Sequence, residues 1–297
     1  MRPLPRTETE AGPPLTWQIG DVKITRIVEF ETTGGTRFLL PEATYDAIRE
    51  IEWLTPHFAD AGGKLKMSIH ALVVEAPGRR IIVDTCIGND KTREMEPWSH
   101  LQTSFLTDLV AAGFGRGSID TVVCTHLHVD HVGWNTMLVD GAWIPTFPNA
   151  RYLIGRTEYE YWRGEAVGED PATSPFHDSV KPVWDAGLVD LVETDHRICD
   201  EVSLEPTLGH TPGHVSIRIR SKGQEALITG DFTHHPCQLA HPEWAPPVDY
   251  DQAASIATRR RVYGQLAGSD VLVIGTHFAA PCAGHVVADG EVWRLKV

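Results

Sequence analysis

The chain has 297 residues, 42% of them hydrophobic and 8% aromatic, which suffices to bury a large core. Its 40 Asp and Glu residues outnumber its 26 Lys and Arg residues, and the net charge of -14 argues against a nucleic-acid partner because it repels phosphate backbones. The sequence lacks an apolar run long enough to cross a membrane and the hydrophobic region of a secretory signal. We therefore expect a cytoplasmic protein without a membrane or nucleic-acid partner. Its five widely spaced cysteines predict reduced thiols rather than disulfides.

The chain begins with a segment that we predict to be a flexible tail, residues 1–16. Four prolines stand there among charged and small residues, and this composition buries too little apolar surface to offset the entropy of ordering. Residues 17–297 are predicted to form a single domain. Strand-like runs occupy its first part, at 17–30, 67–76 and 79–85, with a Pro-Gly turn between the last two.

An insertion separates the first two of these strands. Residues 41–54 space their apolar side chains as a helix does, and Pro41 stands at the start, so an inserted helix is predicted. The whole segment 32–66 is interpreted as a lid over the site or as the contact surface of a homodimer.

The rest of the chain alternates between helix and strand. Residues 101–114 and 250–270 are predicted helices, and each precedes a buried strand, at 119–125 and 271–276. Further short strands are predicted at 150–155, 201–207, 215–221 and 225–230. Strand-rich halves with interspersed helices favour a layered α/β architecture in which helices cover the outer faces of packed sheets.

The most informative motif follows the strand 119–125 directly. His126, His128, Asp130 and His131 lie within six positions, where the chain has just left the sheet and can turn so that their side chains converge. Neutral imidazole and carboxylate suit zinc, iron, manganese or cobalt. Four such groups cannot complete two centres, so the motif predicts further ligands at other strand ends.

Three later residues meet this expectation. His214 ends a glycine- and proline-rich loop before a strand, and Asp231 and His277 each follow a strand. A carboxylate such as Asp231 has two oxygens and can bridge two cations. The seven residues together predict a centre of two divalent metal ions, with zinc favoured over iron, manganese or cobalt.

At this point the chain resembles the metallo-β-lactamase fold superfamily, whose H-x-H-x-D-H motif stands here at His126 to His131. The resemblance covers most of residues 17–297 and implies a four-layer αββα sandwich with the site at one edge of the sheets. It also implies one metal bound by His126, His128 and His214, a second bound by Asp130, His131 and His277, and Asp231 bridging both. Asp84 matches an aspartate of that superfamily that accepts a hydrogen bond from a metal-binding imidazole without binding the metal itself.

This ligand set predicts hydrolysis. Two cations that share a water lower its pKa, so a metal-bridged hydroxide is the expected nucleophile and Asp130 the expected proton shuttle. We favour Asp130 over Asp231 for that role because a bridging carboxylate has its lone pairs engaged by both cations. The expected substrate is a small, uncharged ester or lactone.

Within the superfamily, the chain is similar to the N-acyl-homoserine-lactone lactonases and the methyl-parathion hydrolases. Many of those lactonases carry a tyrosine three residues after the bridging aspartate, where this chain has His234. The histidine is nearer to the parathion-hydrolase pattern and is a candidate to donate a hydrogen bond to the substrate. The competing interpretation is a surface histidine beside His235.

Several alternative functions stay open. Organophosphate triesterase and β-lactamase activity are hydrolytic alternatives, whereas an iron persulfide dioxygenase keeps the same histidine motif without hydrolysing anything. A binding module with structural metal ions is the non-enzymatic alternative.

Residues outside the seven predicted ligands receive lesser roles. Trp134, Phe232 and Phe278 stand near predicted ligands and are candidates to line an apolar pocket. His210 is interpreted as stiffening its loop, and Arg259 as part of a solvated helix face.

Overall fold

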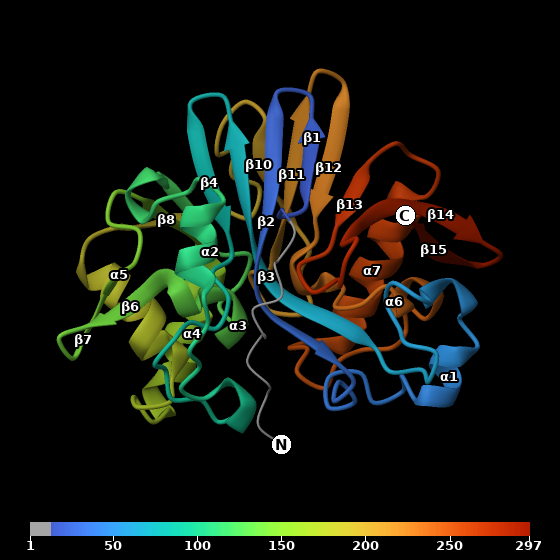
Figure 1. Ribbon diagram of the computed structural model, residues 1–297, viewed down its shortest axis with the longest axis horizontal. Helices are drawn as coiled ribbons and strands as arrows, with labels where there is room; N and C mark the ends of the chain where they lie inside the picture. Colours follow the sequence, from blue (N-terminus) through green and yellow to red (C-terminus); the bar gives the residue numbers. More distant parts are fainter. Residues whose placement is uncertain (1–12) are drawn as a thin grey trace.

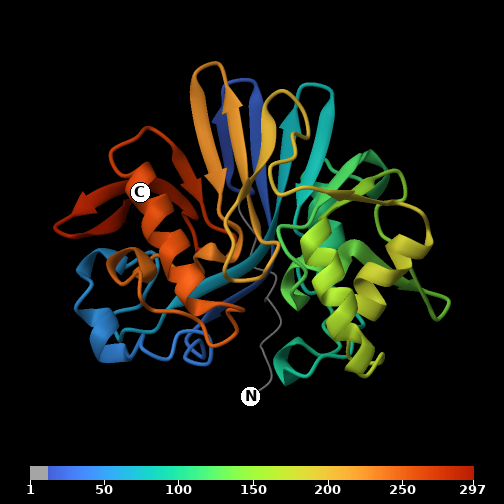
Figure 2. The same cartoon turned by 180° about the vertical axis from the view of Figure 1, so that it is seen from behind.

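Two mixed β-sheets stack face to face in the computed structural model, which describes residues 13–297 (Figures 1 and 2). The first sheet has the strand order β1 (Thr16–Ile19), β2 (Val22–Thr33), β3 (Lys66–Ala76), β4 (Arg79–Val83), β5 (Thr121–Val123), β8 (Arg151–Gly155) and β9 (Val189–Val192). The second has the order β10 (Val202–Pro206), β11 (Val215–Ser221), β12 (Gln224–Ile228), β13 (Leu272–Ile274), β14 (Ala283–Asp289) and β15 (Val292–Lys296). A separate hairpin pairs β6 (Thr136–Val139) with β7 (Ala142–Pro145).

Helices cover both outer sides of this pair of sheets (Figure 1). One side carries α2 (Phe105–Ala111), α3 (Val129–Val132), α4 (Arg156–Glu165) and α5 (Lys181–Asp185). The other carries α1 (Tyr45–Arg49), α6 (Cys237–Ala240) and α7 (Gln252–Leu266). Single helical turns are η1 (Glu52–Leu54), η2 (Glu96–Trp98), η3 (Arg116–Ser118), η4 (Gly133–Asn135), η5 (Ala166–Gly168), η6 (Phe176–Val180) and η7 (Gly230–Phe232). The predicted αββα sandwich is therefore confirmed.

The central strand β3 explains why the layers hold together. Leu72 and Val74 belong to the core shared by the two sheets, whereas Ala71 and Val73 pack toward the helices on the outer side. Successive side chains of a strand point to opposite faces, so a strand buried on both faces must be apolar at nearly every position. That requirement accounts for the unbroken apolar run in this part of the sequence.

Two predicted helices differ in detail from the structure. The helix expected over 101–114 is formed only as α2, and Val110, expected on its buried face, is 58% exposed. The helix expected over 41–54 is split into α1 and η1 because Ile51 has non-helical backbone angles. In α7, Arg259 is fully buried and donates to the carbonyl oxygens of Pro242 and Phe232, so its assignment to a solvated face is wrong.

Two predictions concern the N-terminal region, the flexible tail 1–16 and the inserted segment 32–66. Residues 1–12 of the predicted tail lie outside the described residues, whereas the carbonyl of Leu15 already accepts a hydrogen bond from the Arg26 N–H and β1 begins at Thr16. The inserted segment 32–66 contributes its first residues to the wall of a cavity, described below. Its role in a homodimer stays a prediction.

Further predictions concern the membrane and the cysteines. Within residues 13–297, no helix is both long and apolar enough to span a membrane. The five cysteines are free thiols, and four of them are buried, as predicted.

The topology brings several strand ends to one edge. Strands β4, β5 and β8 run parallel in the first sheet, and β12 runs parallel to β13 in the second. Parallel strands end at the same edge of a sheet, and the loops that follow them are the usual place for a site. Of the predicted ligands, the four motif residues follow β5, Asp231 follows β12 and His277 follows β13, so these six leave the sheets at this edge, while His214 lies in the loop between β10 and β11.

Candidate metal centre

The motif residues are positioned by one strand and one short helix. Strand β5 ends at Val123, the backbone N–H and hydroxyl of Thr125 donate to Asp84, and His128 stands directly before α3. The tight turn depends on Gly133, because a Cβ atom there would lie 1.8 Å from the carbonyl oxygen of Ile87. The chain thus leaves the sheet and folds back at once, which brings the imidazoles of the motif together.

Three imidazole nitrogens form a first group of atoms that can donate a lone pair to a metal ion, called the first donor group below. Nε2 of His126 lies 3.0 Å from Nδ1 of His128, and Nε2 of His210 lies 2.9 Å from that same Nδ1 atom. Nitrogens that bind one tetrahedral zinc ion at about 2.0 Å stand about 3.3 Å apart. The three nitrogens are therefore spaced as the ligands of one ion.

A second donor group lies beside the first. Nε2 of His131 is 3.1 Å from Nε2 of His277, and the carboxylate of Asp130 lies 3.8 Å from the first of these nitrogens and 3.6 Å from the second. Asp231 joins the two groups. Its Oδ2 is 3.1 to 3.2 Å from His277 and His131 and 3.7 to 3.8 Å from His210 and His126. One carboxylate oxygen thus faces both sets of donors.

The sequence-based assignment of His214 is corrected by this geometry. Its Nε2 accepts the backbone N–H of Asp231 at 2.7 Å, and its Nδ1 donates to the carbonyl of Thr207 at 2.9 Å. Both ring nitrogens are therefore committed to the protein, and His214 is fully buried behind the site. His210, interpreted from the sequence as a loop stiffener, stands among the donors instead.

Buried groups hold the donor side chains in position. Asp84 accepts a hydrogen bond from Nδ1 of His131 at 2.8 Å, as the sequence analysis predicted. Asp249 lies 2.7 Å from Nδ1 of His210, and the carbonyl of Ser68 lies 3.1 Å from Nδ1 of His277. Outer partners of this kind fix the ring orientation and leave Nε2 free to bind a metal. The contact with Asp249 is thus independent support for His210 as a donor.

Burial and charge set the protonation of the donors. Burial, with the neighbouring imidazoles, holds the pKa of His126, His128 and His210 well below the ordinary histidine value. Burial also acts to lower the pKa of His131, but the carboxylates, Asp231 foremost, outweigh it and raise that pKa well above the ordinary value. The imidazoles of the first group are therefore neutral, with lone pairs available, whereas His131 in the second group favours a proton that a bound cation would displace.

The donor set fits divalent metal ions. Within residues 13–297, groups of three imidazole or carboxylate residues whose donor atoms converge are found at His126, His128 and His210, and at Asp130, His131 and His277; Asp231 takes part in two further groups. Nitrogen and oxygen donors without thiolate are typical of zinc, iron, manganese and cobalt sites in enzymes. Six of the seven predicted ligands are brought together, and His210 takes the place of the seventh.

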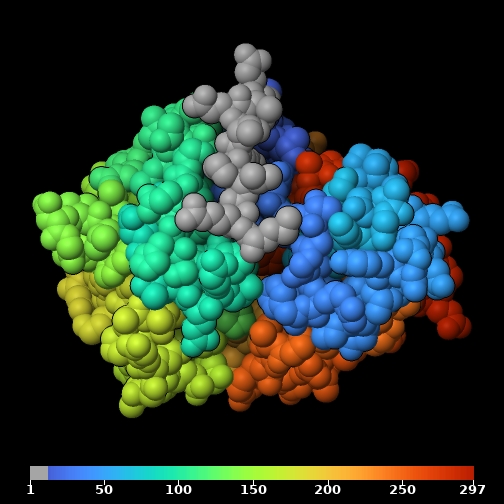
Figure 3. Space-filling model, turned by 60° about the horizontal axis from the view of Figure 1, so that its bottom comes forward, coloured from blue at the N-terminus to red at the C-terminus, as the bar shows by residue number. Residues whose placement is uncertain are grey.

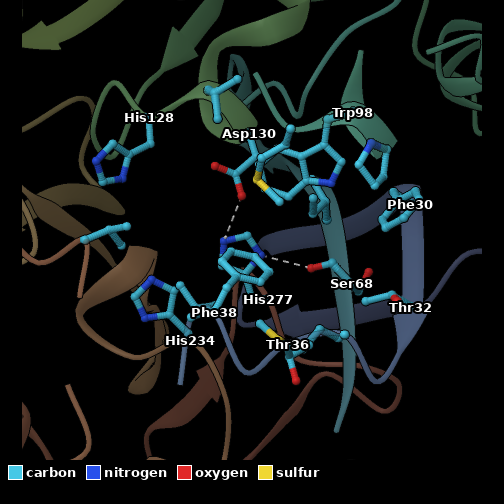
Figure 4. Close-up of a pocket in the computed structure, with 18 of the residues that line it drawn as sticks. Phe30, Thr32, Thr36, Phe38, Ser68, Trp98, His128, Asp130, His234 and His277 are labelled. Carbon is cyan, nitrogen blue, oxygen red and sulfur yellow. Dashed lines mark hydrogen bonds and ion pairs between the residues drawn. The ribbon is translucent and has the colours of Figure 1, made fainter. Parts of the chain in front are cut away.

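A cavity of about 360 Å³ opens onto these donors (Figure 4). Asp130, His234 and His277 line one side, and His277 stands between Asp130 and Ser68. Most of the remaining wall is apolar, and it comes from Phe30, Phe38, Leu39, Met67, Ile69, Met95, Pro97, Trp98, Val129 and Val248. A small molecule with an apolar part fits such a space.

The prediction that three aromatic residues close to the ligands in sequence line the pocket was wrong. Trp134, Phe232 and Phe278 are buried in the core instead, although each stands near a donor in the sequence. The cavity is lined instead by residues that the sequence analysis did not select, such as Trp98, Phe30 near the end of β2 and Met67 near the start of β3.

Comparison with known proteins identifies the family. The model of the Metallo-beta-lactamase superfamily matches residues 66–277. An N-acyl homoserine lactonase of Bacillus cereus is 26% identical in an alignment of 188 residues that covers 58% of this chain and 67% of that relative. Two solved structures share the fold. Hydrolase AbOPH has a TM-score of 0.78 at 24% identity over 97% of this chain and 98% of its own. AidC, described as a dizinc quorum-quenching lactonase, has a TM-score of 0.72 at 19% identity over 95% of this chain and 96% of its own. The chain therefore belongs to the metallo-beta-lactamase superfamily, and it is a metal-dependent hydrolase.

Proposed function

We propose that this protein hydrolyses small, uncharged lactones or esters at a centre of two divalent metal ions. The observation that carries the proposal is the apolar cavity of about 360 Å³ that opens onto two donor groups sharing Asp231. Such a cavity admits an apolar acyl group and leaves the carbonyl to face the donors.

The residues that would hold the ions follow from the contacts. His126, His128 and His210 would hold one ion. Asp130, His131 and His277 would hold the other, and Asp231 both. Ions bound there supply activation of a water molecule and polarisation of a carbonyl group. Zinc is the metal that we favour.

Asp130 is the proposed proton carrier. Its side chain is 14% exposed and lines the cavity, and within residues 13–297 it forms no hydrogen bond, whereas Asp231 accepts several. Asp231 is buried, and its Oδ1 accepts the hydroxyl of Thr276 at 3.1 Å. Of the two carboxylates, Asp130 is therefore the one that substrate can reach, and it can accept a proton and release it to the leaving oxygen.

His234 is the proposed contact for the substrate oxygen. It lines the cavity, its Nε2 lies 3.2 Å from Oδ2 of Asp231, and its Nδ1 has no hydrogen-bond partner within residues 13–297. The ring lies parallel to that of His277, at a centroid distance of 5.9 Å. A surface position is excluded because His234 is only 2% exposed.

Lactones are the first substrates to test. The Bacillus cereus relative is named an N-acyl homoserine lactonase, and the AidC structure contains the product of such a reaction. The net charge of -14 disfavours anionic substrates and agrees with a neutral one.

The test combines metal analysis with a substrate panel. Purified protein is assayed with γ-lactones, p-nitrophenyl esters, paraoxon and nitrocefin, before and after treatment with a chelator, and its metal content is measured per chain. We expect about two ions per chain and chelator-sensitive hydrolysis of lactones above the other substrates. Active protein without a transition metal, or protein that hydrolyses nitrocefin or paraoxon while leaving lactones intact, would contradict the proposal.

A further inference from the structure

Arg259 of helix α7 is a charged side chain with no exposed surface. Its Nε donates to the carbonyl of Pro242 at 2.9 Å, and its Nη1 donates to the carbonyl of Phe232 at 3.2 Å and to Oγ of Ser255 at 2.9 Å. Arginine is almost never fully buried unless its charge is paired. The partner of this charge therefore indicates what the residue does.

The counter-ion of Arg259 is Asp249, the residue that holds His210. Nη1 of Arg259 lies 3.8 Å from Oδ2 of Asp249, and Oδ1 of the same carboxylate lies 2.7 Å from Nδ1 of His210. The neighbours Val248 and Tyr250 are 50% and 61% exposed, and orange atoms around residue 250 form part of the surface in Figure 3. The carboxylate of Asp249 thus turns inward from a surface segment and stands between the arginine and the metal donor.

Arg259 also contacts the loop of the bridging carboxylate. The carbonyl that accepts its N–H at 3.2 Å belongs to Phe232, the residue directly after Asp231. Oδ2 of Asp231 lies 3.7 Å from Nε2 of His210, although the two residues come from different loops. One guanidinium is therefore linked to both donors, to His210 through Asp249 and to Asp231 through the adjoining peptide group.

Other side chains of α7 hold the same two loops. The hydroxyl of Thr258 donates to the carbonyl of Leu208 at 2.7 Å, in the loop that carries His210. The hydroxyl of Tyr263 donates to Oγ1 of Thr233 at 2.7 Å, in the loop that carries Asp231. The inward face of α7 thus supports both loops.

The pair of Arg259 and Asp249 is not explained by stability alone. Two charges lose their hydration on burial, and well-packed apolar residues in their place are often as stable or more stable. What a guanidinium adds is geometry, because it is planar and presents its N–H groups in a fixed fork. A fork that contacts two loops at once fixes the distance between them.

We infer that Arg259 is a positioning residue for the metal centre, and that it holds His210 at the distance from Asp231 that the ion of the first donor group requires. The inference rests on the proposed centre of two ions but not on the proposed substrate. Asp231 has anchors of its own, because its N–H donates to His214 and its Oδ1 accepts the hydroxyl of Thr276. Loss of Arg259 should therefore weaken binding of the first ion and spare the second.

The test measures zinc binding to the chelator-treated full chain by calorimetry. Arg259→Met removes the guanidinium, whereas Arg259→Lys keeps a cation beside Asp249, which spares the fold, but cannot form the same fork. The same two substitutions at Arg218 are the matched control, because that arginine is also buried and is paired with Glu205 at 2.8 Å instead. The binding step that is lost in His210→Ala identifies the first ion.

Affinity for the first ion should fall about 10- to 100-fold in Arg259→Met, the effect of losing an outer partner of a ligand. In Arg259→Lys it should fall about 3- to 10-fold, the effect of a lost hydrogen bond. Affinity for the second ion, and both affinities in the Arg218 variants, should change less than about threefold. If Arg259→Met does not fold, Arg259→Lys decides. Unchanged affinity for the first ion, or an equal loss for both ions, would overturn the inference.

Imidazole proton NMR of the chelator-treated proteins gives a readout that lower stability alone would not change. The signal of the Nδ1 proton of His210, assigned by its absence from His210→Ala, should shift in both Arg259 variants and stay in place in both Arg218 variants. An unmoved signal in the Arg259 variants contradicts the inference. If the wild-type protein binds no zinc, the proposed centre fails, and the NMR signal still decides whether Arg259 positions His210.

Discussion

Two histidines four residues apart are expected to differ in what alanine substitution does to metal binding. Nε2 of His210 faces the donor nitrogens, whereas both nitrogens of His214 are bonded to the protein. His210→Ala removes one of three donors. Loss of an outer hydrogen-bond partner already weakens metal binding about 10- to 100-fold, so loss of this donor should weaken binding of one ion by at least about 100-fold.

His214→Ala should leave the donors in place and destabilise the fold. It leaves the buried N–H of Asp231 without an acceptor, at a cost of about 1 to 3 kcal/mol, and it opens space where a fully buried ring had packed. We expect the free energy of unfolding of the metal-free protein to fall by about 3 kcal/mol. Metal-free His210→Ala should also lose stability, because it removes a buried ring and leaves the buried carboxylate of Asp249 without its contact at 2.7 Å, so metal content is what separates the two variants.

The assay measures both quantities on both variants. Elemental analysis at a fixed chelator concentration gives the metal content per chain, and urea unfolding of the chelator-treated proteins gives stability. Retention of two ions by His210→Ala, together with loss of an ion from a normally stable His214→Ala, would refute the correction and restore the sequence-based assignment.

Three other substitutions test the site and its surroundings. Asp130→Asn keeps a ligand oxygen but cannot carry a proton, so kcat should fall about 10²- to 10⁴-fold while metal content stays unchanged; a fully active variant would end this assignment. His234→Ala should lower kcat/KM for lactones about tenfold, the value of a hydrogen bond to a developing charge; the matched His235→Ala removes a ring bonded to Phe58 and should lower stability instead. Lys91 is buried beside Asp178 and Arg93, and burial lowers its pKa to about 7 from an ordinary 10.5. Between about pH 7 and pH 10.5 the Lys91 amine is therefore protonated in the unfolded chain but not in the folded protein, so the free energy of unfolding rises with pH. Lys91→Met should remove about 2 to 3 kcal/mol of that gain between pH 7 and pH 9, measured by urea unfolding, and identical slopes for both proteins would contradict the assigned pKa.

Much of the architecture could be predicted from local patterns. Strand ends are visible as apolar runs that stop at a polar residue, and this signal located His126, Asp231 and His277 at the correct edge. The choice between His210 and His214 could not be made in this way. It depends on the carbonyl of Thr207, seven residues before His214, and on the backbone of Asp231, seventeen residues after it, and only the folded chain brings both to the ring of His214.

The residues of the cavity wall could not be predicted from the sequence for a related reason. Proximity to a ligand in the sequence selected Phe232 and Phe278, but neighbouring side chains leave a strand end in different directions, and these two point into the core. Phe30 and Met67 reach the cavity because β2 and β3 extend past the end of β4 toward the site. Which strand overhangs another depends on register, and register is a property of the assembled sheet.

Helix α4, which carries no metal-donor residue, also connects the two loops that bear His128 and His210. Glu158 of α4 accepts the N–H of Leu127 at 3.0 Å with one carboxylate oxygen and the N–H of Gly213 at 2.9 Å with the other. A side chain at Gly213 would collide with the backbone of Glu158, since a Cβ atom there would lie 2.4 Å from its nitrogen. Burial raises the pKa of Glu158, and the N–H groups of both loops, together with the indole N–H of Trp162, offset the cost of that burial by donating hydrogen bonds to the carboxylate. The spacing of His128 and His210 is therefore set by α4 together with the sheet edge, and the donors are held in register by contacts of the fold itself.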